Sequence, residues 1–224
     1  MSNLTLIIPA KHEAESLPIV LEELKKFECK IDIVLHATDT KTIQAIKDYN
    51  VNIVYQKNFG YGDAIIEGIN RCGTEYFCIF NADGSFNPLE LDNMRDTMLN
   101  KKLDFLFGSR YQANSGSEDD TILTFIGNYL FSFIGKVFFK LNITDILYTF
   151  VIGRTDKAKQ LNLLEKKFSF CVELPIKAKK LNMNSISIGS YERKRIAGKK
   201  KVNAFKDGFQ ILIYMIKIFF SKWK

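Results

Sequence analysis

Short apolar runs alternate with helical patterns along the first 110 residues, and this alternation limits the folds open to the chain. The predicted strands span residues 4–9, 31–35, 51–55, 76–80 and 105–107, and the predicted helices span residues 16–27, 40–48, 61–71 and 88–100. Strands that alternate with helices build βαβ units, whose mostly parallel sheets are covered by helices on both faces. We therefore expect an α/β fold with a Rossmann-like sheet.

The second half is organised differently. A polar, flexible break at residues 113–120 precedes a phenylalanine-rich segment, residues 121–141, whose polar interruptions predict an amphipathic helix and not a membrane span. A strand, a helix and a strand are predicted at residues 147–153, 170–181 and 185–191. We divide the chain into one domain, residues 1–202, with a first half to about residue 111 and a second half from about 112, and a terminal amphipathic helix, residues 203–224.

The composition bounds the cell compartment and the partners. The four cysteines form no C-x-x-C pair, and residues 4–9 read as a strand and not as a secretion signal, so we expect a cytoplasmic protein without a transmembrane span. Much of the net charge of +7 lies in residues 192–201, just before the terminal helix. A basic segment beside an amphipathic helix predicts contact with an anionic membrane surface. The alternative is that the terminal helix packs on the sheet or on a second copy in a homodimer.

Several chemistry-bearing residues follow the predicted strands. The carboxyl ends of parallel strands share one edge of the sheet, where ligands bind in open α/β folds. Asp83 follows the fourth strand, and two glycines in the Gly60-Tyr61-Gly62 turn allow close backbone approach at the start of a helix. An isolated carboxylate at this edge can hold a divalent metal against a phosphate. Together with Glu13 and Asp39, these residues suit a nucleoside diphosphate.

The order of the motifs resembles one family. Ile8-Pro9-Ala10-x-x-Glu13, Gly60-x-Gly62-x-Ala64, Asn81-Ala82-Asp83, Gly108-Ser109-Arg110-Tyr111 and Arg193-x-Arg195-x-x-Gly198-x-Lys200 occur as in family 2 glycosyltransferases. The likeness is greatest to the branch of dolichol-phosphate mannose synthases and polyprenyl-phosphate sugar transferases. It implies a GT-A fold and metal-dependent transfer of a sugar, with inversion, from a UDP- or GDP-linked donor.

The resemblance also implies roles for single residues. The residues that would contact the donor are Pro9, Ala10, Glu13, Asp39, Gly60, Gly62, Asn81, Ala82 and Asp83. Of these, Asp83 and Asn81 would hold Mg²⁺ or Mn²⁺, although Asn81 stands where the family has an acid and contributes no charge. The residues that would bind the phosphates and the acceptor are Arg110, Arg193, Arg195 and Lys200.

The acceptor is left open. The expected acceptor is a lipid-linked one, most of all polyprenyl phosphate, whose anionic oxygen needs no base and only positioning by Arg110 and the metal. If the acceptor is instead a glycan hydroxyl, as in surface-polysaccharide assembly, Asp145 is the candidate general base. A third interpretation, prompted by Asn81, is a non-catalytic protein that binds sugar nucleotides or nucleic acid. The basic segment lacks interleaved aromatic residues, so no nucleic acid partner is expected.

Overall fold

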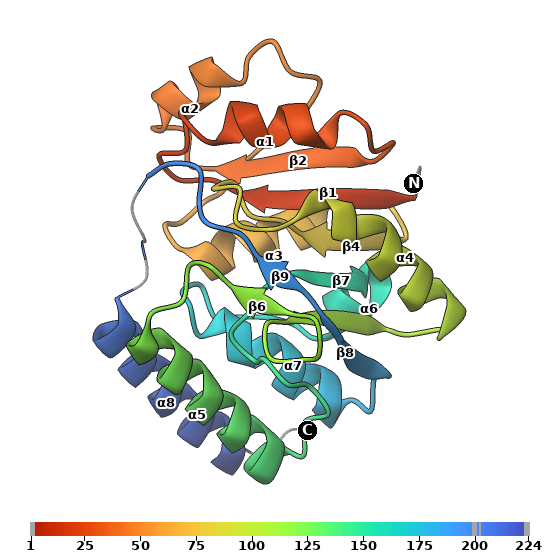
Figure 1. Ribbon diagram of the computed structural model, residues 1–224, viewed down its shortest axis with the longest axis vertical. Helices are drawn as coiled ribbons and strands as arrows, with labels where there is room; N and C mark the ends of the chain where they lie inside the picture. Colours follow the sequence, from red (N-terminus) through yellow and green to blue (C-terminus); the bar gives the residue numbers. More distant parts are fainter. Residues whose placement is uncertain (1–2, 199–200, 202, 222–224) are drawn as a thin grey trace.

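The computed structural model describes residues 3–198, 201 and 203–221, and it has the expected α/β architecture (Figure 1). A seven-stranded sheet has the order β3-β2-β1-β4-β7-β5-β8. Its strands are β1 (Leu4–Pro9), β2 (Lys30–Leu35), β3 (Asn52–Tyr55), β4 (Tyr76–Ile79), β5 (Phe105–Ser109), β7 (Val151–Arg154) and β8 (Ser185–Gly189). The strands β6 (Gly116–Ser117) and β9 (Tyr191–Glu192) form a separate parallel pair.

The first half of the sheet follows the βαβ pattern. β1 pairs in parallel with β2 and with β4, and β2 pairs in parallel with β3. These strands are apolar because helices cover both faces, and Leu6, Ile7 and Ile8 are all fully buried. The carboxyl ends of β1, β2 and β4 therefore meet at one edge of the sheet.

The second half departs from the predicted elements. β7 begins at Val151, later than the predicted strand at residue 147, and runs antiparallel between β4 and β5. The strand predicted at residues 185–191 is divided at Ser190, whose backbone N–H donates to Ser109 O, and the chain then leaves the sheet to pair with β6. The polar break at residues 113–120 contains β6 and is held by this pairing.

Two apolar clusters fill the space on either side of the sheet. One contains residues of α1 (Leu17–Leu24) and α4 (Leu91–Asn100), and α2 (Thr40–Ala45) ends beside it. The other contains residues of α3 (Tyr61–Arg71), α6 (Thr155–Gln160), α7 (Phe170–Lys180) and α8 (Ala204–Phe220), and α5 (Ile122–Phe139) packs against it. A 3₁₀ turn, Pro88–Glu90, precedes α4, and α6 was not predicted. The division of the chain at residue 202 stays a prediction.

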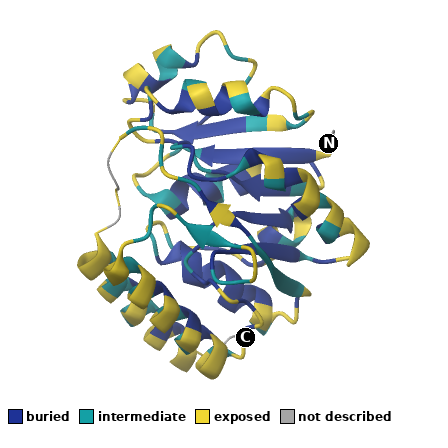
Figure 2. Ribbon diagram, viewed as in Figure 1, coloured by how far each residue is buried: buried dark blue, intermediate teal, exposed yellow. Residues whose placement is uncertain are grey.

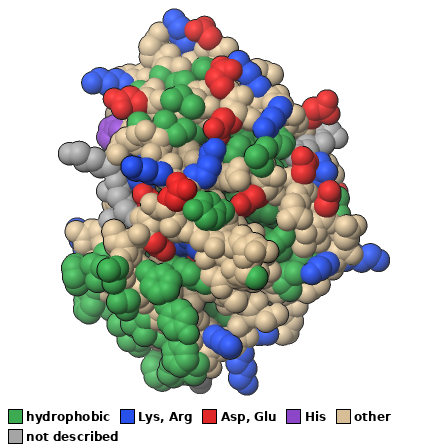
Figure 3. All heavy atoms as spheres, in the orientation of Figure 1, with side chains coloured by type: hydrophobic (Ala, Val, Ile, Leu, Met, Phe, Trp, Pro, Cys, Tyr) green, Lys and Arg blue, Asp and Glu red, His purple; other side chains and the backbone are tan. Residues whose placement is uncertain are grey.

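The helices α5 and α8 lie side by side at one end of the molecule, with large apolar side chains exposed (Figures 2 and 3). Phe131 of α5 lies near Gly208 of α8, and Phe138 and Phe139 contact Phe219, so the two helices run in the same direction. Among the described residues, Ile122–Phe139 is the helix that passes a length and composition test for a membrane span, with a mean hydropathy of 1.6. Three of the residues that interrupt its apolar sequence, Asn128, Ser132 and Gly135, face the protein and are its buried residues, whereas Lys136 is exposed.

Candidate active site

A cavity of about 480 Å³ runs from the carboxyl edge of the sheet to the beginning of α5. Eight of the residues predicted to contact a donor line it: Pro9, Ala10, Glu13, Asp39, Gly60, Asn81, Ala82 and Asp83. We call this the sheet-edge end. The other end, which we call the α5 end, is lined by Arg110, Asp120, Thr124, Asn128 and Glu192. The predicted site residues Gly62, Asp145 and Arg193 are not in the lining, and Lys200 lies outside the described residues.

Asp39 organises the loops at the sheet-edge end. It is the N-cap of α2, and its carboxylate accepts hydrogen bonds from the backbone N–H of His12 (2.6 Å) and from the Thr42 hydroxyl (2.9 Å). Burial alone raises the pKa of Asp39, but these hydrogen bonds bring it below its ordinary value. Glu13 accepts from the Ser16 hydroxyl and pairs with Lys201. Both acids are thus held in place at the wall of the cavity.

Asp83 follows β4 and has a cationic partner. Its carboxylate accepts from the backbone N–H of Ser85 (3.0 Å) and lies 3.4 Å from the Arg195 guanidinium, which also contacts Asp119 at 3.1 Å. The segment that carries Arg195 is fixed to this loop, because Ile196 N–H donates to Asp83 O and the Ile196 side chain packs over Gly84. Of the predicted basic residues that the structure describes, Arg195 is therefore the one beside the predicted metal ligand.

Arg193 lies in a different environment. Its guanidinium donates to both carboxylate oxygens of Glu23 on α1, at 3.1 and 2.8 Å, and to Phe86 O at 3.0 Å. These contacts tie the basic segment to the first helix. The structure thus places Arg193 as an anchor away from the cavity, and its predicted contact with a phosphate stays a prediction.

Asn81 belongs to a hydrogen-bonded set around Tyr61. The Tyr61 hydroxyl lies 3.4 Å from Asn81 Oδ1 and 2.6 Å from Thr149 Oγ1, and Asn81 Nδ2 donates to Ser85 Oγ at 3.2 Å. Burial raises the pKa of Tyr61, so the hydroxyl remains protonated and is able to donate. Tyr61 lines the cavity, and its spacing in the sequence gave no sign of this role.

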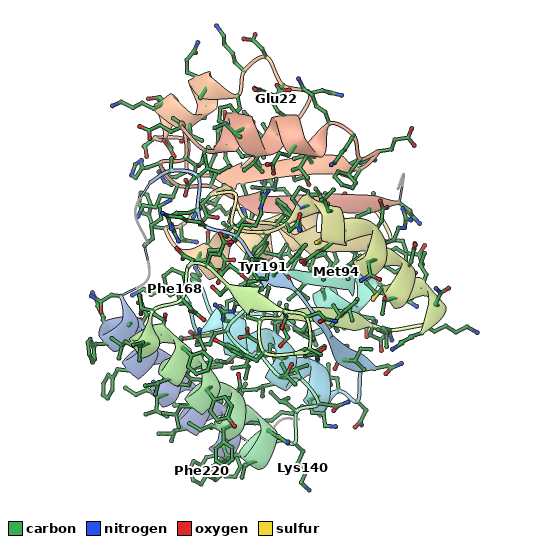
Figure 4. The ribbon with its side chains drawn as sticks, viewed as in Figure 1. Glu22, Met94, Lys140, Phe168, Tyr191 and Phe220 are labelled. Atoms are coloured by element: carbon green, nitrogen blue, oxygen red, sulfur yellow. The ribbon has the colours of Figure 1, made fainter. Side chains whose placement is uncertain are left out.

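Glycine is required at positions 60 and 62 because the loop before α7 passes close to both residues. A Cβ atom on Gly60 would lie 2.0 Å from Lys166 O, and one on Gly62 would lie 2.1 Å from Glu165 O. Gly60 also has φ of 147°, which favours glycine. The two residues therefore admit the loop before α7, which brings Phe168 against the Tyr61 ring (5.4 Å between centroids; Phe168 is labelled in Figure 4).

A buried ion cluster forms the α5 end. Arg110 donates to both oxygens of Asp145, at 2.7 and 3.0 Å, and also contacts Glu192 (3.2 Å) and Asp120 (3.5 Å). Its guanidinium stacks over the Tyr148 ring at 4.8 Å. Burial alone lowers the pKa of Arg110, but the charge of Asp145 raises it above its ordinary value, so the guanidinium is permanently charged.

Asp145 does not reach the cavity. Its side chain is 0% exposed, and Arg110 covers both of its oxygens. The carboxylates that do line this end are Asp120 and Glu192, which sequence reasoning missed. Asp120 is the residue before Thr121, the N-cap of α5. The acidic run at residues 118–120 was a signal that an acid lies there, but it did not indicate which side chain faces inward.

The residues at Asp83 fit a divalent cation that takes most of its ligands from a bound phosphate. Among the residues that the structure describes, no group of three or more His, Cys, Asp or Glu side chains is placed to hold a metal alone. Asp83 offers one carboxylate and Asn81 one amide oxygen, which are hard oxygen ligands of the kind Mg²⁺ and Mn²⁺ prefer. In the structure, the Arg195 guanidinium lies 3.4 Å from the Asp83 carboxylate and balances its negative charge.

The fold is shared with solved glycosyltransferases. Glucosyl-3-phosphoglycerate synthase from Mycobacterium tuberculosis, in complex with Mn²⁺, uridine diphosphate and phosphoglyceric acid, superposes with a TM-score of 0.73 at 10% identity. The match covers 99% of this chain and 80% of that one. The fold is therefore of the GT-A type, as expected.

Sequence comparison identifies the family. The model of glycosyl transferase family 2 matches residues 5–161. An undecaprenyl-phosphate mannosyltransferase of Micrococcus luteus is 23% identical over 88% of this chain and 86% of its own length. A UDP-N-acetylglucosamine–dolichyl-phosphate N-acetylglucosaminyltransferase of Methanococcus voltae is 24% identical over 85% and 84%. The match of the family model to most of the chain shows that it belongs to glycosyl transferase family 2.

Proposed function

We propose that the chain is a membrane-surface glycosyltransferase that moves a sugar from a nucleotide-sugar to a lipid-linked acceptor. One observation carries this proposal: the buried side of α5 is polar and its exposed side is apolar, the reverse of the arrangement in a helix that faces water. Its buried residues are Asn128, Ser132 and Gly135, whereas Ile122 (82%) and Tyr129 (63%) are among its exposed ones. Such a helix suits an apolar environment outside the protein, and Asn128 on its polar side lines the cavity.

The donor would bind at the sheet-edge end. Pro9, Ala10 and Asp39 would lie against the nucleoside, which is linked to uridine or guanosine diphosphate. Asp83 and Asn81 would hold Mg²⁺ or Mn²⁺, and the metal would supply Lewis-acid stabilisation of the departing diphosphate. Arg195 would exchange Asp83 for a diphosphate oxygen, because its guanidinium lies 3.4 Å from that carboxylate and is 19% exposed.

The apolar surface of α5 and α8 would rest on the cytosolic face of a membrane. Phe209 and Phe220 of α8 are 64% and 78% exposed and extend the apolar surface of α5 (Figure 3; Phe220 is labelled in Figure 4). Continuous exposed apolar patches of this kind mark interaction sites. The basic residues that precede and follow α8 in the sequence would contact anionic headgroups. Lys200 would either be one of these residues or contact the donor phosphates. Alternatively, a second copy of the chain would cover the same face in a homodimer.

Two acceptor groups are in view. The names of the relatives from Micrococcus luteus and Methanococcus voltae support a polyprenyl phosphate. The three carboxylates around Arg110 support instead an acceptor with a hydroxyl group, because they already satisfy the cation that would receive a phosphate. In both cases the acceptor oxygen would attack the anomeric carbon from the side opposite the diphosphate, with inversion.

The experiment follows radiolabel from donor to lipid. The protein is incubated with Mn²⁺, a bacterial total lipid extract and labelled UDP-glucose, UDP-N-acetylglucosamine or GDP-mannose. We expect one donor to place label in the organic phase, and the Asp83→Ala variant to place none there. Thermal stabilisation by UDP or GDP with Mn²⁺, lost in the same variant, would separately establish the donor site. Label that stays in water with every donor would contradict the lipid acceptor.

A further inference from the structure

The α5 end carries more negative than positive charge. Arg110 is the cation of this end, and it contacts three carboxylates, those of Asp120, Asp145 and Glu192. All four side chains are at most 11% exposed. Even without the charge of Glu192, whose pKa is raised by burial, two carboxylates share one guanidinium. A phosphate monoester would bring further negative charge into a cluster in which the carboxylates already outnumber the guanidinium.

The rest of this end is neutral and suited to hydroxyl groups. α5 contributes Thr124 and Asn128 to the cavity wall, an alcohol and an amide without charge. The other arginine in the described part of the lining, Arg195, contacts Asp83 and Asp119. Buried phosphates are held by arginine and lysine side chains that are available to them, whereas neutral polar groups are typical of sugar and alcohol recognition.

Asp120 is the carboxylate in position to receive a proton. Its Oδ1 accepts from the Thr124 hydroxyl (3.0 Å) and from Asn128 Nδ2 (3.3 Å). Its Oδ2 accepts from the Tyr111 hydroxyl (3.0 Å). A carboxylate oxygen accepts about two hydrogen bonds, so Oδ2 retains a lone pair, while four donors, counting Arg110 on Oδ1 at 3.5 Å, fix the orientation of the group. Asp145, by contrast, acts through Arg110 and is a positioning residue.

We propose that the acceptor is a lipid with a free hydroxyl group, and that Asp120 is the base that takes its proton. This inference rests on the proposed function and specifies its acceptor. The O–H bond breaks as the proton passes to Asp120 Oδ2, and the oxygen forms a bond to the anomeric carbon. The bond from that carbon to the diphosphate oxygen breaks, and its electron pair leaves with the nucleoside diphosphate.

The position of Asp120 joins the base to the apolar surface. Asp120 and the N-cap Thr121 lead directly into Ile122 and Leu123, which are 82% and 50% exposed. The beginning of α5 would thus lie where a membrane surface meets the cavity, which is the depth at which a lipid presents its headgroup hydroxyl.

The test compares two defined amphiphiles. Octyl β-D-glucoside presents hydroxyl groups and farnesyl phosphate presents a phosphate; each is offered with Mn²⁺ and the donor found above. We expect transfer to octyl β-D-glucoside, and a fall in kcat/KM of at least ~100-fold in Asp120→Asn. The variant keeps the shape and the hydrogen-bond acceptor, and its Mn²⁺-dependent thermal stabilisation by the nucleotide should equal that of the wild type. Asp96→Asn, on the exposed side of α4, is the matched control and should change neither quantity.

A pH profile separates a base from a structural carboxylate. In the wild type, kcat/KM for the hydroxyl acceptor should rise with pH through an acidic limb, and the residual rate of Asp120→Asn should lack that limb. Tyr111→Phe removes the hydrogen bond that orients Asp120 Oδ2, so kcat/KM for the hydroxyl acceptor should fall in this variant too, even if Asp120→Asn folds poorly. An acidic limb that persists in Asp120→Asn, or an unchanged kcat/KM in Tyr111→Phe, would overturn the assignment.

The outcomes distinguish this inference from the proposed function. Transfer to farnesyl phosphate, with Asp120→Asn as active as the wild type or more active, would overturn the hydroxyl acceptor and leave lipid glycosylation standing. Failure of both amphiphiles and of the lipid extract, with nucleotide binding intact, would overturn the proposed function itself.

Discussion

The two ends of the cavity are built in different ways. The sheet-edge end comes from loops that directly follow β1, β2 and β4, so the topology of the sheet alone brings Glu13, Asp39 and Asp83 together. The α5 end comes from residues 110–192, in segments that meet through the pairing of β6 with β9 and through side-chain contacts. One end is fixed by the topology of the main sheet, and the other largely by a buried set of charges.

The charges at the two ends also differ in their freedom to rearrange. At the sheet-edge end, Asp83 and Arg195 are 15% and 19% exposed and lie 3.4 Å apart. At the α5 end, Arg110 is 7% exposed and Asp145 is fully buried, with contacts of 2.7 and 3.0 Å. A partly exposed pair can exchange partners at low cost, whereas a buried pair loses several kcal/mol when one member is removed. We infer that the charged side chains at the sheet-edge end exchange partners when a ligand binds, whereas those at the α5 end keep their arrangement.

Removal of Arg110 should give the largest effect on stability. Arg110→Ala leaves Asp145 buried without its cation and places Asp120 and Glu192 near it. We expect the free energy of unfolding to fall by about 3–5 kcal/mol, measured by urea denaturation. The control is Arg95→Ala, which removes a partly exposed arginine that pairs with the exposed Asp92 and Asp96 and should cost at most about 1 kcal/mol. Equal losses in the two variants would refute the fixed arrangement.

A methyl group on Gly62 should have the next largest effect. Gly62→Ala places a Cβ atom 2.1 Å from Glu165 O, so the loop before α7 must move and Phe168 with it. We expect a loss of about 1–3 kcal/mol and weaker binding of the nucleotide, because Tyr61 loses its stacking partner. Gly127→Ala on α5 meets no atom within 4 Å and should stabilise the protein by about 1 kcal/mol. Thermal unfolding compares the two, and a stable Gly62→Ala would show that the loop is not held by this contact.

The same difference explains what the sequence could predict. The first five strands and Asp83 were predictable because apolar runs and their ends are local features. Asp120 and Glu192 were missed because no local pattern records that β6 pairs with β9, which draws the polar break at residues 113–120 over the cavity. Asp145 was chosen as a base from a motif position, but only the structure shows that Arg110 covers both of its oxygens.

The helices show a related limit of sequence patterns. The residues that interrupt the apolar run at 121–141 are Asn128, Ser132, Gly135 and Lys136, and they correctly indicated an amphipathic helix; the first three are buried and Lys136 is exposed. An amphipathic pattern does not state which stripe faces the protein, and in α5 it is the polar one. The orientation of that helix follows from its packing beside α7 and α8.

Restoration of an acid at residue 81 would sharpen the account of the sheet-edge end. Asn81→Asp adds a second carboxylate beside Asp83, and metal affinity rises with the charge of the ligands. We expect the Mn²⁺ concentration at half-saturation of nucleotide binding to fall about tenfold. The Ser85 hydroxyl, which now accepts from Asn81 Nδ2 at 3.2 Å, can reverse and donate to the new carboxylate. An Mn²⁺ requirement that does not change would place the metal elsewhere.

The pH dependence of stability at the α5 end should show the smallest effect. Burial raises the pKa of Glu192 above its ordinary value of 4.5. Between 4.5 and that raised value, the folded protein binds more protons than the unfolded chain, so the contribution of Glu192 to stability is complete below 4.5 and is lost as the pH rises through the folded pKa. The difference in unfolding free energy between the wild type and Glu192→Gln should therefore shift against the wild type over this window, by roughly 1 kcal/mol. Urea denaturation of both proteins at several pH values from 4.5 upward measures this difference. Burial also raises the pKa of Glu90, but Glu90 is present in both proteins, so its effect on the difference cancels. A difference that grows in favour of the wild type would mean that the charge of Arg110 outweighs burial at Glu192, and that the α5 end holds its carboxylates fully ionised.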